Sequence, residues 1–224
     1  MQTVYNDLVR PPRETVEAFR EVLKEYSPSC LVTDARKRVG AIGGFHTVRP
    51  EHKVVGPALT VNLSVDDLVD CMPVLARAEP GDIVVVACHG TPLTAMWGGL
   101  MSTLSLKAGI TAGVVDGAVR DVDEIRDLDF PLWYRSTVPR PSPTAVHDRT
   151  EPVQVNVPVV VGGQVIRPGD LLVADENGIA VVPQAETDDV LAGTRLGIGK
   201  ERTIREKIAS GATVTALLEE FGHL

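Results

Sequence analysis

Apolar residues recur at helical spacing near the start of the chain. Between residues 12 and 39 they fall every three or four positions, and Val16, Phe19, Val22 and Leu23 share one stripe. A Ser-Pro-Ser sequence in the middle of this stretch offers capping residues for a second helix. The pattern therefore predicts two helices that cover one edge of a core.

Long apolar runs further along predict strands that are buried on both faces. Stretches with helical spacing separate these runs, which is typical of an α/β layer. The predicted strands span 53–63, 82–88, 111–117 and 131–136. Three helices are predicted between these strands. The first begins with Ser64 as N-cap and ends at Pro80-Gly81, the second spans 98–108, and the third is a short acidic helix over 121–128.

The pattern changes after Pro139, where Val-rich segments are separated by Gly-Gly, Pro-Gly-Asp and Glu-Asn-Gly turns. This part predicts a β-meander. A long helix over about 185–210 has more polar surface than one core requires, so we expect it to be solvated or packed on a neighbouring subunit. Because no repeat or Gly/Ser linker interrupts the sequence, we expect a single domain over 1–224 with a core at about 29–183.

Composition excludes several classes of protein. The chain has 224 residues, 44% of them hydrophobic, and a net charge of -8, which is not the charge of a protein that grips nucleic acid. Cys30, Cys71 and Cys88 are odd in number and lie in apolar surroundings, which favours buried thiols over disulfides or a zinc site. No signal core or membrane-length apolar run is visible, so we expect a cytoplasmic protein without membrane contact.

Two short sequences carry candidate chemistry. Gly98-Gly99 stands at the start of a predicted helix, where backbone N–H groups favour an anion such as a carboxylate. Arg120-Asp121 follows the predicted strand that contains Val115, and loops at this end of an open sheet form ligand crevices. Arg120 can bind an oxo-carboxylate through its planar fork, and Asp121 can hold a hard divalent cation. The alternative is a capping Asp beside a surface Arg.

These pieces combine into a longer pattern. Gly99, twenty intervening residues, Arg120-Asp121, two more residues and Glu124 make up G-x20-R-D-x2-E/D. With "GDIVVVA", "GVVDGAVRDVDEIRDLDFPLW" and "VNVPVVVGGQVIRPGDLLVADENGIAVVP", the chain resembles the RraA-like family over roughly residues 29–183. That family includes class II pyruvate aldolases acting on 4-hydroxy-4-methyl-2-oxoglutarate and 4-carboxy-4-hydroxy-2-oxoadipate. The resemblance implies a compact αββα sandwich of the swivelling β/β/α type, assembled as a homotrimer or homohexamer with active sites between subunits.

The resemblance also implies roles for individual residues. The backbone amides of Gly98, Gly99, Leu100 and Met101 would hold the substrate carboxylate. Arg120 would bind the oxo and carboxylate oxygens, and Asp121 would coordinate a divalent metal, magnesium first and manganese as the alternative. Glu124 would lie behind the metal, and Glu201, with Glu206 as alternative, would come from the neighbouring subunit.

The implied reaction is retro-aldol cleavage of a 4-hydroxy-2-oxo acid to pyruvate, with oxaloacetate decarboxylation as a side activity because both pass through one enolate. A Schiff-base mechanism would instead need a desolvated lysine, for which Lys107 is the nearby candidate. A non-catalytic relative that binds and inhibits a ribonuclease is the rival. Thr91-Pro92 replaces an acidic residue that the resemblance leads us to expect, which bears on substrate identity.

Other conspicuous side chains fit structural roles. Trp133-Tyr134 suits core and interface packing. The histidines do not show the spacing of metal ligands, although His89 stands beside the proposed pocket; they include His46, His52, His89 and His147.

Overall fold

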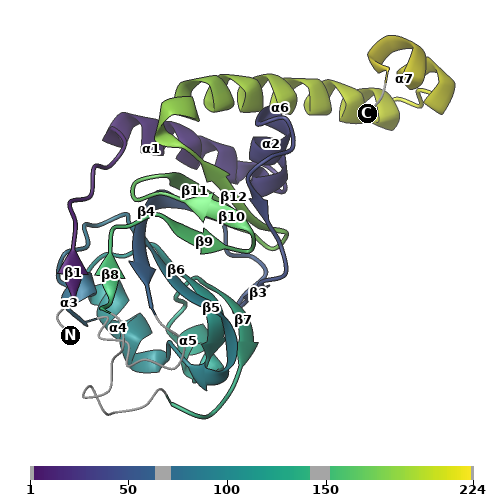
Figure 1. The fold of residues 1–224 in the computed structure, drawn as a ribbon. Helices are drawn as coiled ribbons and strands as arrows, with labels where there is room; N and C mark the ends of the chain where they lie inside the picture. The colour runs from purple at the N-terminus through teal and green to yellow at the C-terminus, as the bar shows by residue number, and fades with distance from the viewer. Residues whose placement is uncertain (1–2, 64–71, 142–151, 223–224) are drawn as a thin grey trace.

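Four layers make up the fold of the computed structural model, which describes residues 3–63, 72–141 and 152–222. One outer layer consists of α1 (Arg13–Arg20), α2 (Pro28–Ala35) and the first half of α6 (Thr187–Ala209). The other contains α4 (Gly99–Lys107) and α5 (Val122–Asp127), and two curved sheet layers lie between them (Figure 1). The αββα expectation is therefore confirmed.

The sheet layers are joined through β4 (Val54–Asn62). This strand is parallel to β5 (Ile83–Ala95) and antiparallel to β11 (Leu171–Asp175). The full order along the sheet is β2 (Ala41–Ile42), β12 (Gly178–Val182), β11, β4, β5, β6 (Ala112–Val119), β7 (Leu132–Thr137) and β3 (His46–Thr47). Strands β4 to β7 are all parallel, so their carboxyl ends meet at one edge.

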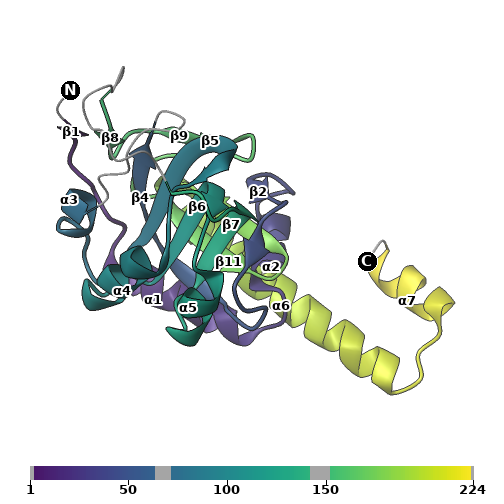
Figure 2. The same ribbon diagram turned by 90° about the horizontal axis from the view of Figure 1, so that it is seen from below.

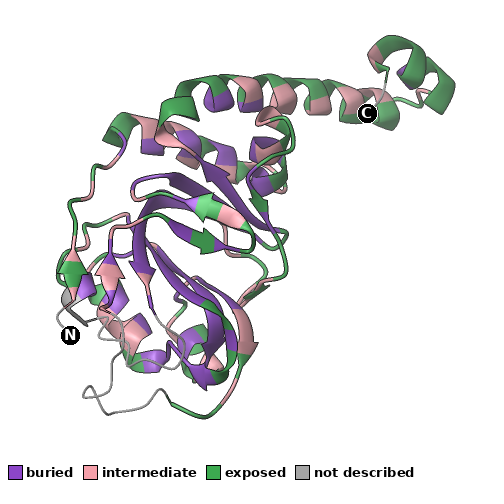
Figure 3. Cartoon of the chain, viewed as in Figure 1, coloured by how far each residue is buried: buried purple, intermediate pink, exposed green. Residues whose placement is uncertain are grey.

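Three clusters of buried residues fill the spaces between the four layers. Along β5, Ile83 and Val85 point into the space between the two sheet layers, whereas Val84 and Val86 point toward α4 and α5. All four are fully buried, which is why this run is continuously apolar. Burying one such side chain contributes about 1.5–3 kcal/mol. Figure 3 shows the resulting purple band of buried strands between partly exposed helices.

The predicted N-terminal helices are present, with one change of geometry. Val16, Phe19 and Val22 are buried under the outer helical layer, as the stripe predicted, and Leu23 packs partly against them. The α-helical part ends at Arg20 and continues as a 3-10 turn over Glu21–Lys24. These helices cover a face of the β4–β11–β12 layer rather than an edge.

The predicted β-meander is only partly correct. Strands β9 (Val159–Val161) and β10 (Gln164–Ile166) form a hairpin that is a separate two-stranded sheet. Strand β11 pairs with β12 and with β4, not with β10. The segment before them, β8 (Gln154–Val155), pairs with β1 (Val4–Tyr5) and with β4.

Strand β5 is longer than predicted. It continues through His89 and Gly90 to Ala95 instead of ending at Cys88. Val86 faces Val115, Thr91 faces Gly117 and Ala95 faces Ala118. The nine residue steps along β5 from Val86 to Ala95 thus match only three along β6, and the extra residues form a bulge with an irregularity on each side of Thr91. Both His89 (φ 56°) and Gly90 (φ 73°) have left-handed backbones within this bulge.

Much of the helix that was predicted to begin at Ser64 lies outside the described residues, as do Cys71 and His147; α3 (Met72–Leu75) is its described part. The prediction of buried thiols holds for Cys88 and is wrong for Cys30, which is exposed on α2. Burial raises the pKa of the Cys88 thiol to about 12. Within 3–63, 72–141 and 152–222, no helix has the length and apolarity needed to cross a bilayer.

The long C-terminal helix is present and extends beyond the body. Its first half packs on α2, and its second half projects outward to α7 (Val214–Phe221), as Figure 2 shows from below. Lys207 of α6 pairs with Glu220 of α7 at 2.6 Å and holds the two helices together. The projecting part leaves apolar side chains exposed, among them Ile208, Val214 and Leu218.

Candidate functional site

Two helices begin at the carboxyl edge of the parallel strands, and the candidate residues lie where they start. Strand β6 ends at Val119, so Arg120 and Asp121 follow it directly and lead into α5. The N–H of Arg120 donates to the carbonyl of Trp97 (3.0 Å), which precedes the glycines of α4. The two predicted segments are thus neighbours in space.

Asp121 faces α4 rather than its own helix. It occupies the N-cap position of α5 in a left-handed conformation (φ 57°) and makes no side-chain capping bond. Its Oδ2 instead accepts a hydrogen bond from the backbone N–H of Gly99 (3.1 Å) and lies 3.5 Å from Arg120 Nε. Asp121 therefore does not cap its own helix α5 through its side chain, and its carboxylate bonds the first N–H of α4 instead.

The two glycines make this approach feasible. A Cβ on Gly98 would lie 2.7 Å from Asp121 Oδ2 and 3.2 Å from Arg120 Cγ. A Cβ on Gly99 would overlap the carboxylate of Glu124, which rests against the first turn of α4. The G-x20-R-D-x2-E pattern is thus one contact cluster, in which the absence of a Cβ on the two glycines lets these side chains lie directly against α4.

The first turn of α4 leaves N–H groups open. Gly99 N–H is occupied by Asp121, while no described hydrogen bond uses the N–H groups of Leu100 and Met101. Helix starts of this kind bind anions because the N–H groups and the helix dipole both favour negative charge. Of the four residues expected to hold a carboxylate, Gly98, Leu100 and Met101 have N–H groups without a described hydrogen bond.

Arg120 is available for a ligand. Its side chain is 41% exposed, its one described ionic partner is Asp121, and no described residue accepts a bond from its terminal Nη atoms. Beside it lies a pocket of about 400 Å³ between α5 and the end of β7. The residues that line this pocket are Val119, Arg120, Asp121, Val122, Asp123, Thr137, Val138 and Pro139.

The donor set around Asp121 fits a magnesium ion held mainly by water. The Asp121 side chain is 40% exposed, and no described residue donates to its Oδ1. One free carboxylate oxygen suffices for Mg²⁺, which keeps several waters. No group of three or more His, Cys, Asp or Glu close enough to hold a metal occurs in the described ranges.

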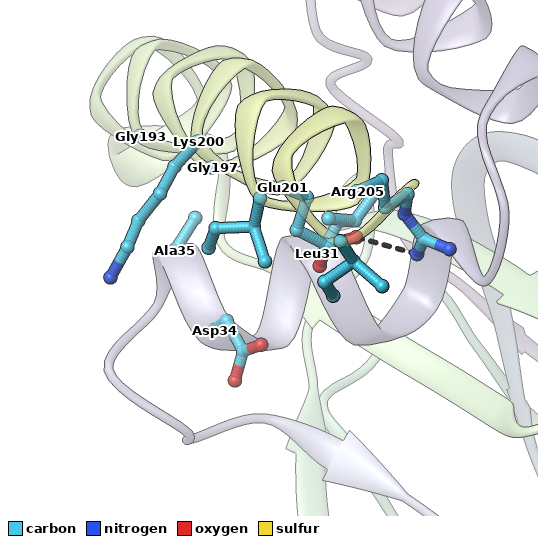
Figure 4. Close-up of a pocket in the computed structure, with 10 residues that line it drawn as sticks. Leu31, Asp34, Ala35, Gly193, Gly197, Lys200, Glu201 and Arg205 are labelled. Atoms are coloured by element: carbon cyan, nitrogen blue, oxygen red, sulfur yellow. Dashed lines mark hydrogen bonds and ion pairs between the residues drawn. The ribbon is translucent and has the colours of Figure 1, made fainter. Parts of the chain in front are cut away.

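Glu201 and Glu206 lie in the opposite outer layer. Glu201 lines a groove of about 550 Å³ between α2 and α6, where it pairs with Arg205 (2.9 Å) above Leu31 and Ala35 (Figure 4). Both sheet layers separate α6 from α4 and α5 (Figure 1). Within one chain, the structure therefore does not bring either glutamate to Arg120 and Asp121.

Two residues near the glycines were not identified from the sequence. Trp97 is buried, and its indole N–H donates to the hydroxyl of Ser102 in α4 (2.9 Å). The only available signal was the position of a tryptophan directly before Gly-Gly.

The aromatic pair Trp133-Tyr134 is buried, which confirms the predicted core role.

The four layers and the site at the strand edge define an α/β protein whose candidate ligands are anionic. A family model described as Aldolase/RraA matches residues 29–181, and the chain belongs to this RraA-like family. A Halalkalibacterium halodurans protein named "Putative 4-hydroxy-4-methyl-2-oxoglutarate aldolase" is 31% identical over 203 residues, which cover 88% of this chain and 92% of that protein.

Solved structures agree with this assignment. An uncharacterized protein from Pseudomonas syringae pv. tomato has a TM-score of 0.80 and 26% identity, over 99% of this chain and 100% of that one. Streptomyces coelicolor RraAS2, described as an unusual member of the RNase ES inhibitor RraA protein family, has a TM-score of 0.76 and 26% identity, over 89% and 99% of the two chains. The family thus contains both enzyme-named and inhibitor-named relatives.

Proposed function

We propose that the protein is a divalent-metal-dependent aldolase that cleaves a 4-hydroxy-2-oxo acid, such as 4-hydroxy-4-methyl-2-oxoglutarate, and releases pyruvate. The observation that carries this proposal is the contact of Asp121 with Gly99 beside Arg120, which gathers a carboxylate that could hold a metal, a guanidinium and helix amides without partners at one edge. The name of the H. halodurans relative supports the choice of substrate class.

Each group has a separate part in binding. The open amides of Leu100 and Met101 would hold the substrate carboxylate, and the Arg120 fork would bind its oxo and carboxylate oxygens. Asp121 would hold the metal, with Glu124 behind it. A bound magnesium ion would supply positive charge that stabilises the developing enolate oxygen.

The bond changes follow from this arrangement. A base removes the C4 hydroxyl proton, the C3–C4 bond breaks, and its electron pair forms the pyruvate enolate, whose oxygen Arg120 stabilises. Protonation of C3 then gives pyruvate, while C4 leaves as the carbonyl product. Oxaloacetate decarboxylation reaches the same enolate by loss of carbon dioxide and needs no hydroxyl deprotonation, so we propose it as a side activity.

The base is proposed to come from a second copy of the chain or from water. Since the sheets separate α6 from α4 and α5 in one chain, Glu201 can act only at the site of a neighbouring subunit. The projecting half of α6 and α7, with exposed apolar residues, suits such a contact. We therefore propose a homotrimer, or a hexamer of two trimers, with shared sites.

A pyruvate-release assay tests this function. The protein would be incubated with magnesium and a panel of 4-hydroxy-2-oxo acids and oxaloacetate, with lactate dehydrogenase detecting pyruvate. We expect turnover that chelator abolishes and added metal restores. Turnover that persists in chelator, or trapping of substrate by borohydride, would point to a lysine mechanism instead.

A second candidate function is inhibition of a ribonuclease by direct binding. It is favoured by the description of the S. coelicolor relative and by the net charge of -8, which suits a basic partner. An RNase E-type cleavage assay with and without the protein distinguishes the two. Inhibition of cleavage without any pyruvate release would replace the aldolase proposal.

A further inference from the structure

The two glycines at the start of α4 leave room for neighbouring side chains, but they also make the backbone there more flexible. Gly98 and Gly99 admit the side chains of Asp121 and Glu124, yet glycine restricts the main chain less than any other residue. A cradle of backbone amides binds an anion well only when it is already held in place. Something other than the glycines must therefore hold the first turn of α4.

A chain of hydrogen bonds from Trp97 reaches this turn. The indole Nε1–H donates to Ser102 Oγ (2.9 Å), and Ser102 Oγ is within 3.2 Å of the Gly98 carbonyl, to which it donates. The backbone N–H of Ser102 donates to the same carbonyl (3.1 Å). Ser102 is fully buried, so water does not compete for these bonds.

Two further contacts hold Trp97, one through its ring and one through its backbone. The indole ring stacks on Phe130 with centroids 6.2 Å apart and planes 7° from parallel. The backbone carbonyl of Trp97 accepts a hydrogen bond from the N–H of Arg120 (3.0 Å). Trp97 thus connects the rigid core, the first turn of α4 and the backbone of the arginine.

We propose that Trp97 is a positioning residue for the carboxylate site, acting through Ser102 on the Gly98 carbonyl and so on the amides of Leu100 and Met101. This inference rests on the proposed function. A role in packing alone would need only the ring, since phenylalanine can stack on Phe130. The N–H is the part that reaches Ser102, and it is therefore the part to test.

The variants Trp97→Phe and Ser102→Ala remove the two ends of one hydrogen bond. Thr194→Ala is the matched control, because it removes the same kind of bond, from a fully buried hydroxyl to the carbonyl four residues earlier (2.7 Å), in α6 of the opposite outer layer. The Kd of oxalate, a stable mimic of the pyruvate enolate, would be measured by calorimetry with magnesium, together with KM, kcat and Tm.

We expect Trp97→Phe and Ser102→Ala each to raise the oxalate Kd and KM about ten- to hundredfold, with a smaller change in kcat. The double variant should be no worse than the single ones, since both break the same chain. Thr194→Ala should lower Tm and leave the Kd within about twofold of wild type, because its bond lies in the opposite outer layer.

Unchanged oxalate binding in both variants, fully additive losses, or an equal loss in Thr194→Ala would overturn the positioning role while the aldolase proposal stands. If the wild-type protein itself neither binds oxalate nor releases pyruvate from any oxo acid, both proposals fail together. The wild-type measurement therefore distinguishes failure of the positioning role alone from failure of the aldolase proposal.

Discussion

The carboxylate of Asp121 accepts a hydrogen bond from the backbone N–H of Gly99 at 3.1 Å, although the two residues are 22 positions apart in the chain. Asp121 adopts a left-handed backbone to reach it, which turns the side chain away from the helix that it begins. Left-handed non-glycine residues are rare and concentrate at functional sites, and Asp tolerates this conformation better than most.

Asp121→Asn should weaken the binding of Mn²⁺ or Mg²⁺ by more than about tenfold, because the amide loses the charge that a hard cation requires. Calorimetric titration with Mn²⁺ measures this. Tm should change little, since the side chain is 40% exposed. Asp127→Asn at the other end of α5 is the control and should bind metal as wild type does. Equal metal affinity in both variants would remove Asp121 from the metal site.

Arg120→Lys should reduce turnover about 100- to 1,000-fold, because a point ammonium cannot reproduce two parallel hydrogen bonds to a developing oxyanion. Steady-state rates with an aldol substrate and with oxaloacetate should fall together, as the two reactions share the enolate. Arg195→Lys, on exposed α6, serves as the control. Near-normal rates with both substrates would mean that Arg120 is only a surface partner of Asp121.

Gly98→Ala should impair metal binding and turnover with a modest loss of stability, since the new Cβ would lie 2.7 Å from Asp121 Oδ2. Chemical denaturation and metal titration separate these two effects. Gly199→Ala on α6 is the opposite case, because nothing lies within 4 Å of its Cβ position. It should stabilise the protein by about 0.5–1 kcal/mol through helix propensity. An active Gly98→Ala protein would show that the close approach is unnecessary.

Glu201→Gln should slow aldol cleavage more than oxaloacetate decarboxylation, because only the aldol reaction needs a base for the C4 hydroxyl. Light scattering on the same samples should give three or six chains per particle. Glu206→Gln is the matched variant on the same helix, and a selective loss there would transfer the role to Glu206. An active monomer would refute a base supplied by the partner subunit.

Cys88 provides a pH-dependent prediction that is independent of catalysis. Burial raises its pKa from 9.0 to about 12, so the folded state keeps the thiol proton that the unfolded chain loses. This contribution to stability is complete below pH 9 and is lost as the pH rises from 9 through about 12. Urea unfolding at pH 8 and pH 10.5 should show a steeper decline for wild type than for Cys88→Ala.

Thiol labelling checks the same assignment by another route. Iodoacetamide should modify exposed Cys30 in the folded protein and reach Cys88 only after unfolding, as read by peptide mass mapping. Rapid labelling of Cys88 in the native protein would contradict its burial.

Local pattern predicted most of the parallel half of the fold, because strands such as β5 and β6 are buried on both faces and leave continuous apolar runs in the sequence. The local pattern did not predict strand pairs whose members lie far apart in the sequence. Leu171 pairs with Pro57, and nothing near Leu171 identifies that partner. The cluster of Gly99, Asp121 and Glu124 was predicted from the resemblance, whereas the bond from Trp97 to Ser102 depends on side-chain geometry that spacing does not encode.

The bulge of β5 has a consequence for sequence variation. Because Val86, Thr91 and Ala95 all keep partners on β6, the exposed residues between them, His89-Gly90 and Pro92-Leu93, can change in kind without shifting the strand register. The Arg-Asp pair, held by α4 and the end of β6, is insulated from such changes. Exchange of these four residues would therefore alter the exposed part of the bulge while leaving the Arg-Asp pair and its contact with α4 in place.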